Sequence, residues 1–323
     1  MGMSDEECEA TVVAENIPEV PPALSKPAAP AGTPLVHSLV TCSEGCIPRN
    51  KFKPCKFSKS TFHSRRYAGE EETPIGAMPE CYRLGWRHGL VEEARDVGVN
   101  SIVLFSKVPD ALKSCTGDEA YNENRLVPRT IRLLKDKYPD LVIYIDVALD
   151  PYSSDGHDGI VREDGVIMND ENVHQLCKQA VTQARAGADV ARPSDIMDGR
   201  IREIRAALDA DGFQYVSIAS YTAREALVET REDESEGADI LLVKPGLPYL
   251  DIIRLLRDNS HLPIAAYQVS GEYSMIKADG VLKMIDEERV MMESRMCLRR
   301  DGANIIISYF ALQAARCLCG EKR

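Results

Sequence analysis

The hydrophobic residues of this chain change their spacing at about residue 86. Beyond that point, short and nearly continuous apolar runs rich in Val and Ile alternate with amphipathic stretches. Such runs are typical of parallel strands that are covered on both faces. The predicted strands are Ser101–Phe105, Leu141–Leu149, Ala188–Ala191, Val216–Ser220, Asp239–Val243, Pro263–Val269 and Asn304–Phe310. The predicted helices are Val91–Gly98, Pro128–Lys137, Glu171–Gly187, Ile201–Asp211, Arg224–Gly237, Tyr249–Asn259 and Asp286–Gly302.

The order of these elements favours an α/β fold of the TIM (β/α)8 barrel type over a doubly wound sheet. The seven strands recur at intervals close to the roughly 30 residues of one βα unit of such a barrel. No glycine-rich phosphate loop follows the first of them, which argues against a dinucleotide-binding fold. The eighth strand is expected near residues 60–80. Residues 70–80 include Pro74 and Pro79 and do not have a strand pattern, so the first strand of the barrel is unclear.

Composition and charge exclude several classes of protein. The chain has 323 residues, of which 44% are hydrophobic, and its formal net charge is -12. This apolar fraction excludes wholesale disorder, and the acidic balance argues against a nucleic-acid-binding protein. No apolar run reaches the roughly 18–20 residues that span a bilayer, so no membrane segment is expected.

The first 69 residues differ from the rest and are predicted to be a disordered or irregular extension before a barrel domain at residues 70–323. Residues 1–36 are rich in Ala, Pro and Glu, which is typical of an extended arm. Organelle transit peptides contain few acidic residues, so no transit peptide is expected at this N-terminus. Residues 45–69 carry basic side chains without an acid, which favours a solvated tail over a binding segment. Cys42, Cys46 and Cys55 match no common zinc spacing, so reduced thiols are the preferred interpretation.

Polar side chains at the ends of the predicted strands are the candidates for chemistry, because barrel enzymes act at the carboxyl ends of their strands. Lys244 ends an otherwise apolar strand. A desolvated amine there would be a nucleophile toward a carbonyl group, although a lysine that reaches out to the barrel rim is an alternative. Ser194, Ser270 and Tyr309 follow or end other strands.

An aspartate-rich loop follows the second predicted strand. Asp146, Asp150, Asp155 and Asp158 lie within 14 residues, together with His157. Carboxylate oxygens suit Mg²⁺ better than a soft metal, and a solvated loop with Asx turns is the alternative.

These stretches together resemble the porphobilinogen synthase family, also called 5-aminolevulinate dehydratase, in its plant-type form. The matching stretches are Asp146–Gly159, Pro193–Arg200, Leu242–Asp251, Ala266–Lys277 and Arg300–Ala315. The resemblance implies a TIM barrel, usually a homo-octamer, and a hydro-lyase of heme and chlorophyll biosynthesis. It also implies that two molecules of 5-aminolevulinate condense to porphobilinogen with loss of two waters, in the chloroplast.

The resemblance also implies residue roles. Lys244 matches the Schiff-base lysine of the family, and Asp146 and Ser194 match polar residues of its active site. Ser270 and Tyr309 match groups that hold the carboxylate of one substrate.

The metal positions follow from the same resemblance. Ala148, Asp150 and Asp158 stand where zinc-dependent members carry cysteines, which implies the magnesium-responsive type. Glu229 falls where the family binds a further Mg²⁺ between subunits.

The chain departs from the family pattern in two ways. Residues 220–223 run straight into the helix that begins at Arg224, so the family's second active-site lysine and a lid with two arginines are expected to be missing. Arg192 and Arg295 stand at positions that are small or apolar in the family, and so does Asp301. Without the second amine and the arginine clamp, we expect little or no product from this chain.

Two alternatives to the family enzyme follow. One is a catalytically impaired paralogue or incomplete gene product that acts at most as a binding subunit. The other is a generic aldolase-like Schiff-base lyase, which would use Lys244 but leaves the aspartate loop unexplained.

Overall fold

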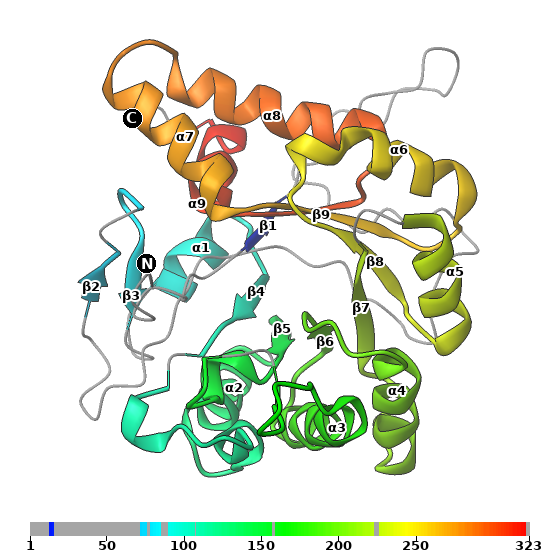
Figure 1. Cartoon of the computed structure of the whole chain (residues 1–323). Coiled ribbons are helices and arrows are strands. Elements are labelled where there is room, and N and C mark those ends of the chain that lie inside the picture. The colour runs from blue at the N-terminus through cyan, green and yellow to red at the C-terminus, as the bar shows by residue number, and fades with distance from the viewer. Residues whose placement is uncertain are drawn as a thin grey trace.

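The computed structural model describes residues 13–15, 72–75, 78–84, 90–106, 108–156, 159–222 and 226–320. Seven parallel strands form one curled sheet with helices around its outside (Figure 1), and all seven were predicted from the sequence. These strands are β4 (Ser101–Leu104), β5 (Val142–Val147), β6 (Val190–Pro193), β7 (Ser217–Thr222), β8 (Ile240–Val243), β9 (Ile264–Gln268) and β10 (Ile305–Ser308). They pair in chain order from β4 to β10, as in a TIM barrel.

Helices connect the strands. They are α1 (Leu90–Asp96), α2 (Leu126–Lys137), α3 (Asn169–Arg185), α4 (Arg200–Ala210), α5 (Ala226–Glu236), α6 (Leu250–Asn259), α7 (Ser270–Val281), α8 (Glu287–Asp301) and α9 (Ala311–Leu318). In Figure 1, α2, α3 and α4 lie below the curled sheet and α6 and α8 lie above it, so both groups cover its outer face. The sequence did not predict α7 or α9, because Ser270-Gly271 has the pattern of a turn and α9 is short. None of the described helices is long and apolar enough to cross a lipid bilayer.

A strand from the N-terminal segment occupies the edge of the sheet. β1 (Val13–Glu15) pairs antiparallel with β10, and Cα atoms of β1 lie within 8 Å of those of β4. The segment expected as an extended arm therefore contributes three residues to the sheet. Pairing with an open strand edge satisfies backbone groups on both strands, which the local sequence pattern does not reveal.

Residues 72–84 form a hairpin, although the sequence analysis expected no strand at 70–80. β2 (Glu72–Pro74) pairs antiparallel with β3 (Tyr82–Leu84) in a separate two-stranded sheet. This hairpin is not the missing barrel strand. Pro74 is tolerated because it lies at the end of an edge strand, where its absent N–H is not needed.

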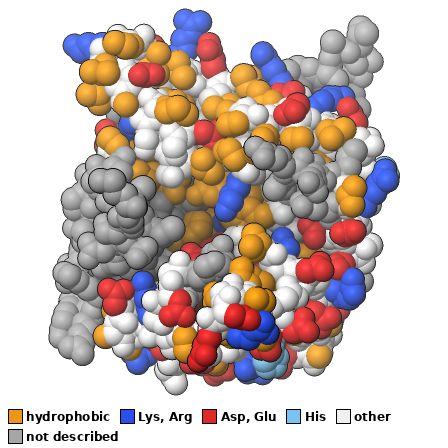
Figure 2. Space-filling view, viewed as in Figure 1, with side chains coloured by type: hydrophobic (Ala, Val, Ile, Leu, Met, Phe, Trp, Pro, Cys, Tyr) orange, Lys and Arg blue, Asp and Glu red, His pale blue; other side chains and the backbone are white. Residues whose placement is uncertain are grey.

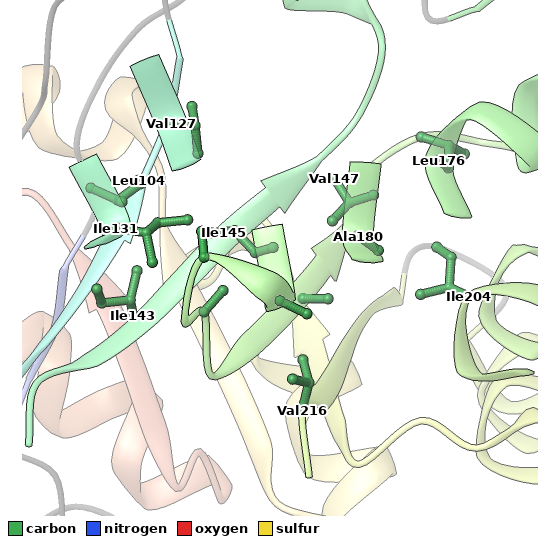
Figure 3. Close-up of a cluster of buried hydrophobic side chains, with 14 of the residues drawn as sticks. Leu104, Val127, Ile131, Ile143, Ile145, Val147, Leu176, Ala180, Ile204 and Val216 are labelled. Carbon is green, nitrogen blue, oxygen red and sulfur yellow. The ribbon is translucent and has the colours of Figure 1, made fainter. Parts of the chain in front are cut away.

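Side chains alternate along each strand between the outer face of the sheet, which the helices cover, and the barrel interior. Ile143, Ile145 and Val147 on β5 pack toward α2 and α3, together with Leu104, Ile131 and Leu176 (Figure 3). Tyr144 belongs to the other core cluster, inside the barrel. Because successive side chains of a strand point to opposite faces, Asp146 lies on the same face as Tyr144.

The same alternation of side chains determines which face of the sheet the residues at the other strand ends present. Val190 is an interior residue of β6, so Arg192 also faces the interior. On β8, Ile240 and Leu242 are interior residues, and Lys244 continues that series one residue beyond the end of the strand. Asp146 and Arg192 thus face the barrel interior, and Lys244 lies just beyond β8 at the mouth of the barrel.

Candidate active site

Arg192 is the most buried charged side chain of the interior. It has no exposed surface, and its guanidinium carbon lies 5.6 Å from the ring centroid of Phe105, 5.1 Å from that of Tyr221 and 5.9 Å from that of Tyr267. Its Nη2 donates a hydrogen bond to the hydroxyl of Tyr221. The sequence analysis identified Arg192 as a departure from the family but gave it no role.

Asp146 lies next to Arg192 on the neighbouring strand. The two residues are register partners of β5 and β6. Burial lowers the pKa of Arg192, and the negative charge of Asp146 is the largest effect that opposes this shift. The structure therefore brings the predicted catalytic carboxylate together with a cation that balances its charge.

Lys244 lies at the mouth of the barrel, over the ring of Tyr221. Its Nζ is 4.5 Å from the Tyr221 ring centroid, an attractive cation–π arrangement. The side chain is exposed, so the expectation of a desolvated amine is wrong for this structure. β8 ends at Val243, so Lys244 stands one residue beyond the strand, at the rim of the barrel, where an amine can reach solvent.

Glu272 fixes the loop that follows Lys244. Its carboxylate accepts hydrogen bonds from the backbone N–H groups of Leu247 and Val269, each at 2.8 Å, and from that of Gly246 at 3.3 Å. Burial raises the pKa of Glu272, while these three donors lower it. The sequence analysis missed this role, because Glu272 stands in a stretch with the pattern of a turn and two of its donors, Gly246 and Leu247, follow a different strand.

The three predicted substrate-binding residues all follow strands of the barrel, but their surroundings differ. Tyr309 is buried behind β10, with its hydroxyl oxygen 3.2 Å from that of Tyr267. Ser194 follows β6 and is half-buried, whereas Ser270 is exposed at the start of α7. Tyr267 and Tyr221 were not predicted as site residues, since an aromatic residue in a strand is usually part of the core.

The described residues do not assemble a metal centre. Asp150 lies in a short helix, Asp150–Tyr152, while Asp158 is outside the described residues, and the side chain of Glu229 is not described either. Within the described part of the chain, no group of three or more His, Cys, Asp or Glu side chains could hold a metal ion. Cys42, Cys46 and Cys55 lie outside that part as well.

The fold and the site together define a class: a TIM-barrel enzyme with an amine, a carboxylate and tyrosine hydroxyls at the mouth of its barrel. A family model narrows the class further, since the one described as delta-aminolevulinic acid dehydratase matches residues 60–224 and 222–317. The chain belongs to the delta-aminolevulinic acid dehydratase family.

Individual relatives agree with this assignment. The chain is 67% identical to delta-aminolevulinic acid dehydratase 1, chloroplastic, of Arabidopsis thaliana, over all of this chain and 85% of the relative. It is 68% identical to the chloroplastic enzyme of Glycine max, over 99% of this chain and 88% of the relative. A crystal structure of the dehydratase from Toxoplasma gondii, in complex with the reaction product porphobilinogen, is similar with a TM-score of 0.76 and 42% identity. That likeness covers 80% of this chain and 83% of the other.

The comparisons also bear on the connection between β7 and α5. The Arabidopsis alignment runs over 367 positions although this chain has 323 residues, so at least 44 of those positions have no residue here. The two parts of the family match meet at residues 222–224. This is the place where the sequence analysis expects the missing lid.

Proposed function

We propose that this chain is a porphobilinogen synthase, which condenses two molecules of 5-aminolevulinate to porphobilinogen with loss of two waters. The observation that carries the proposal is the placement of Lys244 at the mouth of the barrel, on the interior face of β8, with its Nζ against the ring of Tyr221. Family membership supports the reaction, and the names of the plant relatives support the chloroplast as its place of action.

The proposed first step is formation of an imine at Lys244. The uncharged Nζ attacks the ketone carbon of 5-aminolevulinate, the carbonyl oxygen leaves as water, and a carbon–nitrogen double bond remains. A nearby acid or base must move the protons of this step. Asp146 is the candidate, because it projects to the same interior face and Arg192 balances its charge.

Substrate recognition is proposed to involve polar groups on the same rim. Tyr309 and Ser270 follow adjacent strands, β10 and β9, and their hydroxyls can donate to a carboxylate. Ser194 follows β6 and can donate in the same way. These roles rest on the family resemblance and on the shared position of the three residues after strands.

Mg²⁺ is the proposed metal, bound through Asp150 and Asp158, with Glu229 at a separate site. Carboxylates are hard oxygen ligands that Mg²⁺ accepts readily. This part of the proposal rests on the residue types and on the family resemblance.

Turnover is expected to be slow in this chain. The amine of Lys244 is exposed, and water hydrolyses imines and weakens electrostatic stabilisation in an open site. The comparisons favour the enzyme over the alternative of a non-catalytic binding subunit, since the relatives are named as dehydratases. They also favour it over a generic aldolase-like lyase, because the family match extends through the aspartate loop.

Borohydride trapping tests the proposal. Incubation with 5-aminolevulinate and borohydride should convert the imine to a secondary amine, with hydride added to carbon and a proton to nitrogen. Mass spectrometry should find this adduct on Lys244, and Lys244→Ala should not form it. Lys283→Ala, which removes an exposed lysine two residues after α7, is the matched control and should still be trapped at Lys244.

The outcomes separate the candidate functions. Trapping together with porphobilinogen supports the synthase, while trapping without product supports a site that only binds. Absence of an adduct on the purified wild-type chain would contradict every Schiff-base mechanism proposed here.

A further inference from the structure

Two nitrogens of Arg192 have no hydrogen-bond partner among the described residues, although the side chain is completely buried. Nη2 donates to the hydroxyl of Tyr221, but Nε and Nη1 bond to no atom of the structure. Leaving donors of a buried cation unsatisfied costs considerably more than a neutral hydrogen bond contributes. The hydrogen-bonding capacity of the Arg192 guanidinium is therefore only partly used.

The groups around Arg192 stabilise its charge without filling these positions. Phe105, Tyr221 and Tyr267 present ring faces to the guanidinium, and Asp146 contributes an attractive charge from β5. Ring faces attract a cation but do not accept its N–H groups in directed hydrogen bonds of normal strength. An oxyanion would both balance the positive charge of Arg192 and accept hydrogen bonds from its Nε and Nη1, because it offers charge and acceptors together.

The guanidinium of Arg192 and the amine of Lys244 share a neighbour, Tyr221. Both cations contact the same ring, with the guanidinium carbon of Arg192 5.1 Å and the Nζ of Lys244 4.5 Å from the centroid of Tyr221. Tyr221 is half-buried and Lys244 is exposed, so this side of Arg192 leads toward solvent. Figure 2 shows that the face of the molecule is hollowed at its centre and that hydrophobic side chains line the hollow.

We propose that Arg192 is a carboxylate-binding residue for a keto acid whose ketone reacts at Lys244. The proposal rests on the proposed function, since it names the residue that binds the carboxylate end of the same substrate. Two methylene groups separate ketone and carboxylate in 5-aminolevulinate, which suits one group at each cation of the shared ring. The alternative is a structural role, in which Arg192 only balances the charge of Asp146.

Levulinate and its methyl ester test the proposal. Both carry the same ketone, but only levulinate carries a carboxylate, so the ratio of their half-saturating concentrations in borohydride trapping reports recognition of the carboxylate alone. In the wild type, levulinate should half-saturate trapping at a concentration about 10- to 100-fold lower than the ester. In Arg192→Met this preference should disappear, whatever change the lost charge balance at Asp146 makes to the trapping of both ketones.

Two further variants control the experiment. Arg295→Met removes the other completely buried guanidinium, which bonds to Met291 and Ser308 rather than facing Tyr221, and should keep the wild-type preference. Arg192→Lys retains a positive charge with fewer donors and should keep a reduced preference, which provides the measurement if Arg192→Met does not fold.

Each outcome bears on a different claim. Equal trapping of levulinate and ester by the wild type, or an undiminished preference in Arg192→Met, would overturn the role of Arg192 and leave the proposed function intact. An equal loss of both ketones in Arg192→Met would assign the residue a structural role. If the wild type trapped neither ketone, the proposed function would be contradicted, and this inference with it.

Discussion

Arg295 shows how a single charged side chain can be accommodated in an apolar position. It is completely buried in α8. Its Nη1 donates to the carbonyl oxygen of Met291 and its Nη2 to the hydroxyl of Ser308 at 3.0 Å, and the guanidinium lies 5.2 Å from the ring centroid of Phe310. These contacts offset part of the cost of removing a cation from water, which amounts to several kcal/mol.

Replacing Arg295 by an apolar residue of similar length should stabilise the fold. Arg295→Met removes the desolvation cost and leaves no essential acceptor unsatisfied, because the Ser308 hydroxyl also donates to Gln268 at 2.7 Å. Urea unfolding should show a free energy of unfolding about 1–3 kcal/mol above that of the wild type. Arg295→Lys keeps the charge but loses the guanidinium contacts, and should be less stable than the wild type. A destabilised Arg295→Met would mean that its hydrogen bonds outweigh its desolvation.

At the scale of elements, glycines end three of the helices as the sequence predicts. Gly187, Gly237 and Gly302 follow α3, α5 and α8 and have φ values of 109°, 106° and 118°. Residues with a Cβ rarely adopt these angles. Each glycine stands three residues before the first residue of β6, β8 or β10. The repeated Gly-Ala pairs therefore mark the turns that return the chain to the sheet.

Gly302 has an additional steric reason to be glycine. A Cβ at this position would lie 2.6 Å from Cγ of Arg257 on α6. Gly302→Ala should therefore lower the free energy of unfolding by about 2–4 kcal/mol, through backbone strain and displacement of that side chain. Gly212→Ala is the matched control, since Gly212 has a φ of 87° and nothing within 4 Å of the added carbon. It should cost only about 1–2 kcal/mol. Equal costs in urea unfolding would contradict the steric argument.

At the scale of the whole molecule, one end of α7 leaves an apolar surface uncovered. Val281 is 72% exposed, Leu282 64% and Met284 75%. Contiguous exposed apolar side chains mark surfaces of association. We therefore propose that copies of this chain associate through this end of α7, in line with the homo-oligomer that the family resemblance implies.

A double substitution tests this association. Leu282→Glu with Met284→Lys should lower the mass measured by light scattering, because charges are costly to bury at an interface. The thermal unfolding of each subunit should change little, since both side chains are exposed. Val228→Glu, another exposed apolar position (67%) but on α5, is the control and should keep the wild-type mass. A wild-type chain that is already monomeric would refute the proposal.

Much of this architecture could be predicted from the sequence. The apolar runs that became β4 to β10 are long enough, and sufficiently rich in Val and Ile, for their burial on both faces to determine their structure. The strand ends also indicated that Lys244 and the aspartate-rich loop lie at the same rim of the barrel. The environment of each could not be predicted, because the burial of a side chain depends on which groups from distant parts of the chain pack around it.

Local sequence therefore determined the parallel strands, the helix stops and the placement of reactive side chains at one end of the barrel, since each depends on residues within a few positions of one another. Only the tertiary structure decided that Arg192 fills the interior beside Asp146, that Tyr221 contacts two cations, that Glu272 holds the loop after Lys244, and that β1 pairs with β10. The reason is physical: burial, charge balance and edge pairing depend on groups far apart in the chain, and no local pattern records them.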